Sequence, residues 1–244
     1  MKTYILLVAA TCCLALSCLT AAAQAPPELK AFQEAAGQNS NLFRGKQAIP
    51  YDRRANGNPY WSSDTFVPGE IVLEGIFYDD ILVNIDAVAG QALVRTEDSP
   101  LAVSLSPDTV GSIMTGDSVF VGLGQDETTL PEGFYEVFGE GPERVYKHVS
   151  KRLLDSTQSK NGDAIGYYDP NYNTNLTAYF AITKTYYFRD SDGVFTKFRS
   201  KGALLRKFPE RRKEIRKALS ASGMDLPGVN FDSYCKEVLK IAAR

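Results

Sequence analysis

EIVLEGIFYDDILVNIDAVAGQALVRTE, residues 70–97, is the stretch of sequence that decides the fold class. It contains three short runs rich in apolar and β-branched residues: Glu70–Phe77, Asp80–Ala87 and Gln91–Glu97. The dipeptide Tyr78-Asp79 and the tripeptide Val88-Ala89-Gly90 separate these runs. Short runs bounded by turn residues, with no room for a helix between them, are typical of antiparallel strands. The stretch therefore predicts a meander of short strands.

Similar runs continue towards the C-terminus. The segments PLAVSLS, DTVGSIMT and DSVFVGLG follow at regular spacing, with breaks at Pro107, Gly111 and Gly116. FYEVFGEG, NLTAYFAIT, TYYFRD and GVFTKF come later, whereas the residues from Tyr146 to Leu153 fit a strand and a helix about equally. We therefore predict an α+β fold that is mainly β, with an antiparallel sandwich or an open, barrel-like sheet.

The pattern becomes helical near the C-terminus. Ser200 is placed to cap a short helix over KGALLRKF, and Pro209 is placed to begin a second helix that ends at Gly223. Asp232 is placed to cap a third helix. The apolar face of this third helix consists of Phe231, Cys235, Val238, Leu239 and Ala242. We predict a C-terminal helical subdomain of two or three short helices.

Four parts are predicted along the chain. They are a cleavable signal peptide (1–23), a short helix with an extended surface segment (24–62), a β-rich body (63–199) and a basic helical tail packed on the body (200–244). The first part combines Lys2, a short apolar run and the small residues Ala21-Ala22-Ala23, as secretory signals do. An alternative is a lipid anchor at Cys18. Because no later stretch is long and apolar enough to span a membrane, we predict an exported chain without a transmembrane segment. It would be periplasmic, outer-membrane-associated or extracellular.

The counts of histidine and cysteine limit the chemistry. Cys12, Cys13 and Cys18 lie in the predicted signal peptide, so Cys235 is left, and we expect it to be a buried hydrophobic residue. His148 is the only histidine, no G-x-S-x-G sequence accompanies it, and we expect it at the surface. An internal disulfide and metal sites built from several histidines or cysteines are excluded. We predict no catalytic residue, no metal and no cofactor.

Asp190-Ser191-Asp192-Gly193 is similar to the start of a calcium-binding loop. A full loop needs further oxygen ligands and a glutamate at its twelfth position, whereas this chain continues into the strand-like VFTKF. We therefore predict a hairpin turn.

Acidic residues and tyrosines leave carbohydrate chemistry open as an alternative, because glycoside hydrolysis requires two acids and no compact motif. The available acids are Asp79, Asp80, Asp86, Glu136 and Glu140. The polar insertion 155–175 carries Tyr167, Tyr168 and Tyr172, a candidate ligand loop because aromatic rings stack on sugars. Turn-forming acids and an exposed loop explain the same residues without chemistry.

A basic stretch lies within the predicted helices. Between Lys197 and Lys217, ten residues are Lys or Arg and two are Glu, although the whole chain has a net charge of −2. The candidate contacts to an anionic surface are Arg211, Arg212, Lys213, Arg216 and Lys217. A solvated helix face and docking of the tail on the protein's own acidic body are the alternatives. Nucleic acid is not an expected partner, because the sequence shows no motif of a known nucleic-acid-binding module.

Two blocks of the sequence resemble a group of uncharacterised exported proteins of Bacteroidetes-type bacteria. The C-terminal block is carried by Tyr186, Tyr187, Phe198, Ser200, Lys201, Leu204, Leu205, Phe208 and Pro209. The earlier block is carried by Gly57, Pro59, Tyr60, Phe66, Gly69, Val72, Tyr78 and Leu82, and GFYEVF at Gly133 matches a further block. The resemblance implies export and a β-rich body with a basic helical tail, and it implies no catalytic residue.

The sequence thus predicts an exported, non-catalytic protein of the cell envelope with a binding or structural role, whose partner is an unknown envelope component. One alternative is a carbohydrate-binding module or a small carboxylate-based glycoside hydrolase. A second alternative is a protein that binds an anionic membrane surface through its basic tail.

Overall fold

The computed structural model describes residues 31, 37, 40–51, 54–125, 128–155 and 178–244. The predicted signal peptide and residues 156–175 of the tyrosine-rich insertion lie outside the described residues, and of the short helix predicted within 24–62 only scattered residues are described. Within the described residues, no helix is both long and apolar enough to cross a membrane.

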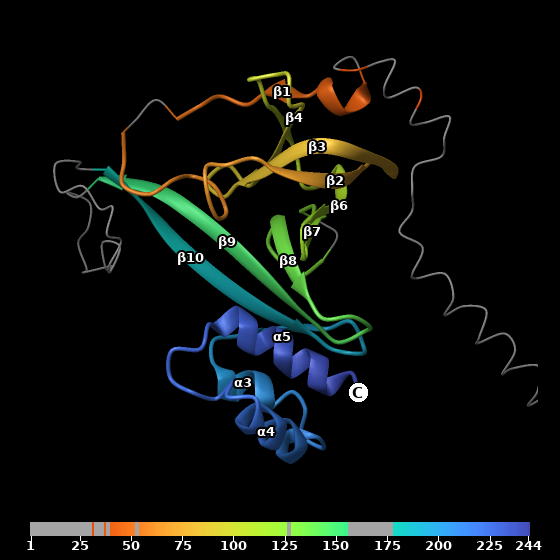
Figure 1. Ribbon diagram of the computed structural model, residues 1–244, viewed down its shortest axis with the longest axis vertical. Helices are drawn as coiled ribbons and strands as arrows, with labels where there is room; N and C mark the ends of the chain where they lie inside the picture. The colour runs from red at the N-terminus through yellow and green to blue at the C-terminus, as the bar shows by residue number, and fades with distance from the viewer. Residues whose placement is uncertain (1–30, 32–36, 38–39, 52–53, 126–127, 156–177) are drawn as a thin grey trace, which may run out of the picture. The chain divides into compact units, whose positions relative to one another are not determined.

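The described strands form one open antiparallel sheet (Figure 1). In chain order they are β1 (Lys46–Gln47), β2 (Val67–Leu73), β3 (Ile76–Asp86), β4 (Gln91–Arg95), β5 (Val103–Leu105), β6 (Val110–Thr115), β7 (Ser118–Leu123), β8 (Gly133–Phe138), β9 (Arg144–Asp155), β10 (Ala178–Arg189) and β11 (Phe195–Phe198). Their order across the sheet is β1-β5-β4-β3-β2-β6-β7-β8-β9-β10-β11, so β1 and β11 are its edges. The predicted mainly β fold with an open antiparallel sheet is confirmed.

The first hairpin turns earlier than the sequence predicts. The chain reverses at Glu74 and Gly75, which have φ angles of 50° and 79°, and Tyr78-Asp79 lies inside β3. Two successive residues with positive φ are what a two-residue hairpin turn requires, and glycine adopts that conformation readily. The predicted break at Tyr78-Asp79 is therefore wrong, although the residue after it is irregular. Asp80 has a φ of 58°, and the pairing of β2 with β3 shifts register opposite it.

Strands β9 and β10 form a long antiparallel pair. The residues from Tyr146 to Leu153, which fit a strand and a helix equally, belong to β9. AYFAIT (178–183) and TYYFR (185–189), which the sequence places in separate runs, are joined in the single strand β10. The predicted hairpin turn at Asp190-Ser191-Asp192-Gly193 is confirmed, because it connects β10 to β11 and the Asp190 carboxylate accepts backbone hydrogen bonds within it.

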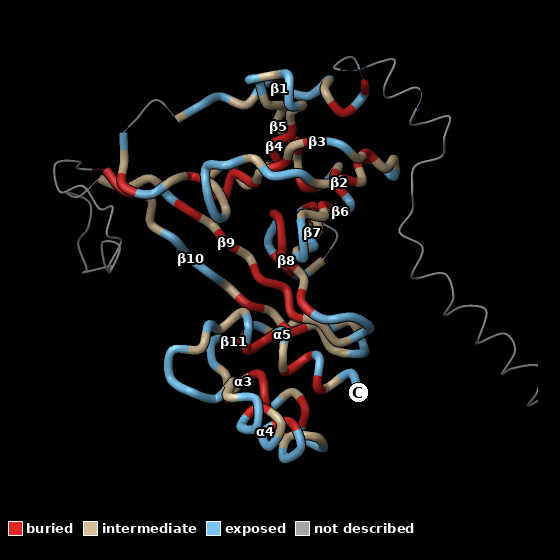
Figure 2. Tube along the Cα trace, in the orientation of Figure 1, coloured by how far each residue is buried: buried red, intermediate tan, exposed pale blue. Residues whose placement is uncertain are grey.

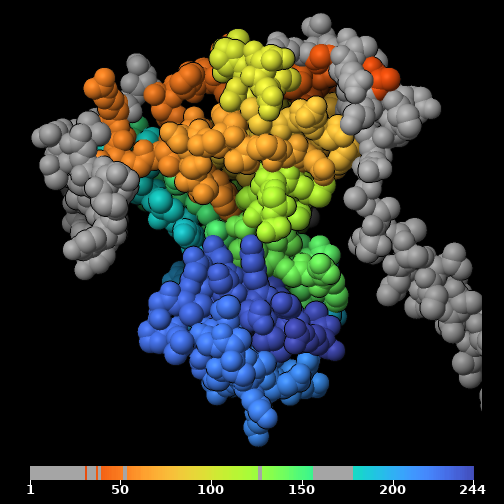
Figure 3. Space-filling view, viewed as in Figure 1, coloured from red at the N-terminus to blue at the C-terminus, as the bar shows by residue number. Residues whose placement is uncertain are grey.

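Three helices pack against β8–β11, and Figure 3 shows this C-terminal part in blue as a compact mass beside the strands. They are α3 (Lys201–Leu205), α4 (Arg212–Ala221) and α5 (Phe231–Ala242), preceded far upstream by the short 3-10 helix η2 (Asn41–Phe43). The predicted Ser200 cap is present, since its hydroxyl accepts a hydrogen bond from Ala203 N. Helix α4 begins at Arg212 rather than at Pro209, and the cap of α5 is Asn230 rather than Asp232.

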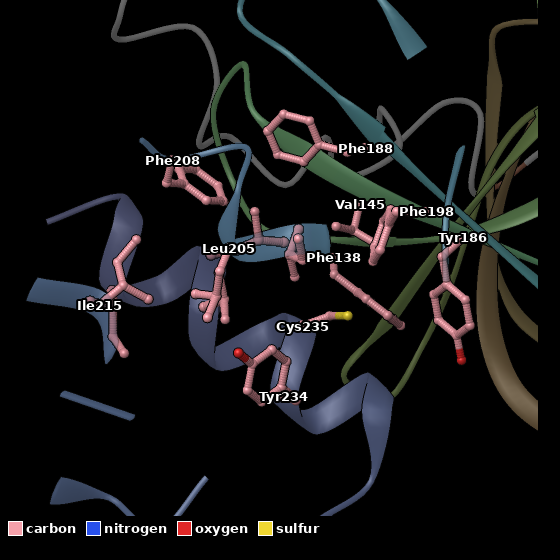
Figure 4. Close-up of a cluster of buried hydrophobic side chains, with 14 of the residues drawn as sticks. Phe138, Val145, Tyr186, Phe188, Phe198, Leu205, Phe208, Ile215, Tyr234 and Cys235 are labelled. Atoms are coloured by element: carbon pink, nitrogen blue, oxygen red, sulfur yellow. The ribbon is translucent and has the colours of Figure 1, made fainter. Parts of the chain in front are cut away.

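The helices and the sheet share one apolar core (Figure 4). Phe138, Val145, Tyr186 and Phe198 from the strands meet Leu205, Ile215, Tyr234 and Cys235 from the helices. A second core, which includes Ile71, Val83, Val94, Ile113 and Phe134, lies where strands β2–β8 curl. Figure 2 shows buried positions along β8 and β9 and exposed ones at the turns. Burial of this kind, at about 25 cal/mol per Å² of apolar surface, is the main stabilising contribution.

The segment from Asn56 to Trp61 bridges strands that are distant in the sheet order. Asn56 pairs with β10 at Tyr179, and Trp61 N donates to Ile85 O of β3 at 2.8 Å. Just beyond β3, Ala87 O accepts a hydrogen bond of 2.8 Å from Lys151 N of β9. These bonds fix the end of β3 against β9 and β10, and they position the site described next.

Candidate functional site

A cleft lies between the segment Lys46–Tyr51 and the end of the sheet formed by β3, β4 and β5. Its volume is about 620 Å³. Its aromatic lining comes from Tyr51, Tyr60 and Phe66, and its polar lining comes from Lys46, Gln47, Asp86, Gln91 and Ser104. Ile49 and Leu101, two of the most exposed large apolar residues, also line it. A concave surface with aromatic walls and a few polar groups is typical of sites for small ligands.

Asp86 lines this cleft, and its carboxylate accepts hydrogen bonds from other groups of the protein. The Tyr51 hydroxyl donates to the two carboxylate oxygens of Asp86 at 3.0 and 2.9 Å. Val88 N and Ala89 N each donate to Oδ1 at 2.8 Å, which closes the turn after β3. Burial and the bond to Asp86 raise the pKa of Tyr51, so its phenol stays protonated. Asp86 therefore holds the cleft wall and has little capacity left for proton transfer.

Tyr60 and Gln91 present uncharged polar groups to the cleft. Tyr60 lies opposite Asp86 in an isolated antiparallel bridge, and burial raises the pKa of its phenol, as do Asp86 and Asp64. Within the described part of the chain, neither the Tyr60 hydroxyl nor the Gln91 amide is bonded to another protein group. Both are therefore free to exchange hydrogen bonds with a bound molecule.

A buried lysine is linked to Tyr60 through hydrogen bonds to Asn58. Lys151 is 5% exposed, and its ammonium donates to Asn58 O at 2.9 Å and to Asn58 Oδ1 at 3.2 Å. Asn58 Oδ1 also accepts a hydrogen bond of 3.0 Å from Tyr60 N. Burial and the nearby Lys184 lower the pKa of Lys151 to about 8, against the opposing effect of Asp86. Lys151 therefore acts on the cleft through Asn58, which sets the backbone position of Tyr60.

A second polar cluster joins the sheet to the helices. The Lys147 ammonium lies 2.9 Å from Glu136 Oε2 and 2.8 Å from Asp232 Oδ2. Tyr186 donates to Asp232 Oδ1 at 2.7 Å, and Lys236 lies 3.6 Å from Glu136 Oε1. Every charge in this cluster has a partner of opposite sign, so its role is to hold α5 on β8–β10. It is a structural cluster rather than a ligand site.

The sequence does not predict this cluster. Asp232 is expected as a helix cap, but its carboxylate is turned to Lys147 and Tyr186 while Asn230 Oδ1 accepts from Asp232 N at 2.8 Å. The interpretation in which a basic tail docks on an acidic body fits the pair of Lys236 with Glu136, whereas the pair of Lys147 with Asp232 has the opposite polarity. There the body supplies the cation and the tail supplies the acid. The signal available in the sequence is that Lys147 shares one face of its strand with Val145 and Val149, because a lysine among buried apolar residues needs a partner.

The acids considered for glycoside hydrolysis do not converge in the cleft. Asp86 and Glu136 are held in the bonds described above. Asp79 and Asp80 line a different groove of about 530 Å³, together with Glu70 and Glu97. Glu140 is exposed in the turn after β8. In the described residues, no group of three His, Cys, Asp or Glu side chains is arranged to hold a metal ion.

The five basic residues proposed for an anionic surface separate into two groups. Arg211 donates to Ile241 O at 3.1 Å and to Ala242 O, and it also pairs with Glu214 at 2.9 Å. It thus closes the C-terminal end of α5. Arg212 is half-buried, and its Nε has no hydrogen-bond partner among the described residues. Arg211 is thus engaged within the protein, and contact of Arg211 or Arg212 with an anionic surface stays a prediction. The other three, Lys213, Arg216 and Lys217, are exposed.

The remaining candidates have simple locations. His148 is half-buried and stacks on Tyr135 at 4.9 Å between ring centroids, and burial lowers its pKa, so the expected surface position is wrong. The expectation for Cys235 is confirmed, because the thiol is fully buried and burial, with a contribution from Asp232, raises its pKa to about 12. Tyr167, Tyr168 and Tyr172 lie outside the described residues.

Comparison of the chain with protein-family models, curated proteins and solved structures found no match. The resemblance to exported Bacteroidetes-type proteins therefore stays a prediction. A proposal for function rests on the geometry of the cleft.

Proposed function

We propose that this chain is an exported, non-catalytic binding protein of the cell envelope whose cleft takes a neutral, hydroxyl-rich ligand of the carbohydrate class. The observation that carries the proposal is the combination of aromatic rings with unengaged, uncharged polar groups at Tyr60 and Gln91. The predicted signal peptide supplies the argument for export.

The chemistry of the lining favours a neutral ligand. Of the described residues that line the cleft, Asp86 is the only acid, and its oxygens are already occupied by four hydrogen bonds. Lys46 is the only base among them. Sugars offer apolar C–H faces that pack on aromatic rings and hydroxyl groups that exchange hydrogen bonds with amides and phenols. The cleft therefore provides complementary contacts for a sugar without requiring a charge on it.

The same contacts favour binding over hydrolysis. A glycosidase needs one carboxyl group as an acid and a second as a base or nucleophile on either side of the bond that breaks. This cleft offers one carboxylate, and the Tyr51 hydroxyl and two backbone N–H groups hold it. A cleft with this arrangement of groups binds a sugar without cleaving its glycosidic bond.

The test is titration calorimetry of the chain from Gln24 to Arg244 with a panel of neutral tetrasaccharides that includes cello-, chito-, manno- and laminari-oligomers. We expect at least one of them to bind, and we expect Gln91→Ala to weaken that binding about tenfold through the loss of one well-placed amide. Thr183→Ala, on the exposed part of β10, is the control that leaves affinity unchanged. The absence of binding by every oligomer, or equal affinity in Gln91→Ala, would overturn the proposal.

A further inference from the structure

Helix α4 carries its cations on the side opposite its buried residues. Ile215 and Leu219 are fully buried in the core shared with the sheet. Lys213, Arg216 and Lys217 are exposed, and their spacing of three and four residues places them on one face of the helix. We call these three residues the α4 cationic face.

Among the described residues, the charges of this face have no ion-pair partner. Glu214, the one acid in α4, pairs with Arg211, which is itself bonded to the end of α5. Within the described part of the chain, no ion pair involves a residue of the α4 cationic face. Arg211 therefore removes the nearest opposing charge and leaves the positive potential of the face available to a partner.

An exposed apolar side chain lies at the end of the same helix. Leu226 is 59% exposed and lies in the loop after α4, which ends at Ala221. Its N–H donates to Gly223 O at 3.3 Å, so the loop keeps Leu226 close to the C-terminal turn of α4. A cationic helix followed by a loop with an exposed leucine suits the boundary between lipid headgroups and acyl chains. A water-soluble polyanion would use the cations but gain nothing from the leucine.

We propose that the α4 cationic face and Leu226 bind the surface of an anionic phospholipid bilayer. Figure 1 shows α4 on the far side of α5 from the strands, whereas the cleft lies at the end of the sheet formed by β1, β5 and β4. A bilayer in contact with α4 would therefore leave the cleft open to its ligand. The contact is peripheral and reversible, because three cations and one leucine give modest affinity.

The test is co-sedimentation of the chain from Gln24 to Arg244 with vesicles of phosphatidylcholine, with and without about 30 mole per cent phosphatidylglycerol. We expect binding only to the anionic vesicles at about 0.05 M salt, and its loss at about 0.5 M salt. The triple variant Lys213→Gln, Arg216→Gln, Lys217→Gln is expected to lower the partition coefficient roughly a hundredfold. Leu226→Gln is expected to lower it severalfold at unchanged charge.

Two controls separate this proposal from simpler ones. The variant Arg44→Gln, Arg54→Gln, Lys197→Gln removes the same charge from exposed positions elsewhere and should bind the vesicles as the wild type does. Soluble polyphosphate serves as the second ligand. The proposal is overturned if the wild type does not bind anionic vesicles or if the two triple variants lose binding equally. It is also overturned if Leu226→Gln has no effect on vesicles while polyphosphate competes fully, since a general polyanion site would then be the better description.

Discussion

Lys147 of β9 and Asp232 of α5 form an ion pair of 2.8 Å across the junction of the sheet and the helices. The two residues are 85 positions apart in the chain, and the Lys147 side chain is 8% exposed. Glu136 and Tyr186 complete their hydrogen bonds. The basic tail supplies the acid of this pair and, through Lys236, a cation to Glu136, so contacts of both polarities join apolar burial in docking the tail on the body. The net charge of the tail is left free to face outward at α4.

Asp232→Asn should destabilise the protein by about 3 kcal/mol, since breaking a buried ion pair leaves Lys147 with less compensation. Urea denaturation monitored by circular dichroism measures the free energy of unfolding. Asp192→Asn, in the exposed turn between β10 and β11, is the matched control and should change it little. Equal stability of Asp232→Asn and wild type would show that the pair contributes nothing to docking.

The same pair predicts a loss of stability in acid. Burial raises the pKa of Asp232, but hydrogen bonds from Lys147 and Tyr186 outweigh burial, so its pKa lies below the ordinary 3.8. A carboxylate whose pKa is lower in the folded than in the unfolded state stabilises the protein at pH values above its unfolded-state pKa. This stabilisation is lost as the pH falls through the folded-state pKa. We expect the difference in unfolding free energy between wild type and Asp232→Asn to shrink below about pH 4. A difference that stays constant from neutral pH to pH 2 would contradict this assignment.

Lys151 predicts a rise of stability with pH in the alkaline range. Its folded-state pKa is about 8 while the unfolded value is 10.5, so the unfolded chain binds more protons between these values. The contribution of Lys151 to stability therefore rises with pH in this window, by about 1 kcal/mol between pH 8 and pH 9. Stability measured relative to Lys151→Met isolates this contribution from the tyrosines that titrate nearby. A flat difference would mean that Lys151 keeps its ordinary pKa, and a difference that falls with pH would mean that its pKa is raised; either would contradict the prediction.

The β2–β3 turn predicts a stabilising substitution. Glu74 adopts a φ of 50°, which is unfavourable for a residue with a side chain, and Gly75 follows at 79°. Glu74→Asn places the favoured Asn-Gly pair in this turn, and we expect a gain of about 0.5–1 kcal/mol in unfolding free energy. Lys197→Asn, in the exposed edge strand β11, should give no such gain. A destabilised Glu74→Asn would show that the Glu74 side chain has a role of its own.

Local patterns in the sequence predict most of the fold, and the errors have physical causes. Alternation and turn residues locate the strands, and Ser200 marks the start of α3 as expected. The turn expected at Tyr78-Asp79 forms instead at Glu74-Gly75, because Gly75 readily adopts the positive φ that a two-residue turn needs. Tyr78-Asp79 is therefore part of β3. Aspartate is a residue type that often caps helices, so the sequence predicts a cap at Asp232. In the folded chain its carboxylate instead pairs with Lys147, which is distant in the sequence.

The candidate cleft is harder to predict because it is assembled from separate segments. Tyr51, Tyr60 and Gln91 come from three segments that carry no common motif. What brings them together is the bridging by Asn56–Trp61 and the bonds of Asp86, which exist only in the folded chain. The basic stretch shows the same limit. Composition identifies all five cations, but the end of α5 decides that Arg211 is used inside the protein.

The most direct test of the binding proposal is to map where an oligosaccharide contacts the protein. We would record amide chemical shifts of the chain from Gln24 to Arg244 by two-dimensional NMR during titration with each neutral tetrasaccharide. We predict that one of them shifts the amides of Tyr51, Tyr60, Gln91 and Ser104 in a saturable manner, and leaves those of α4 unchanged. Shifts confined to other surfaces, or none with any oligomer, would contradict the assignment of the cleft as a carbohydrate site.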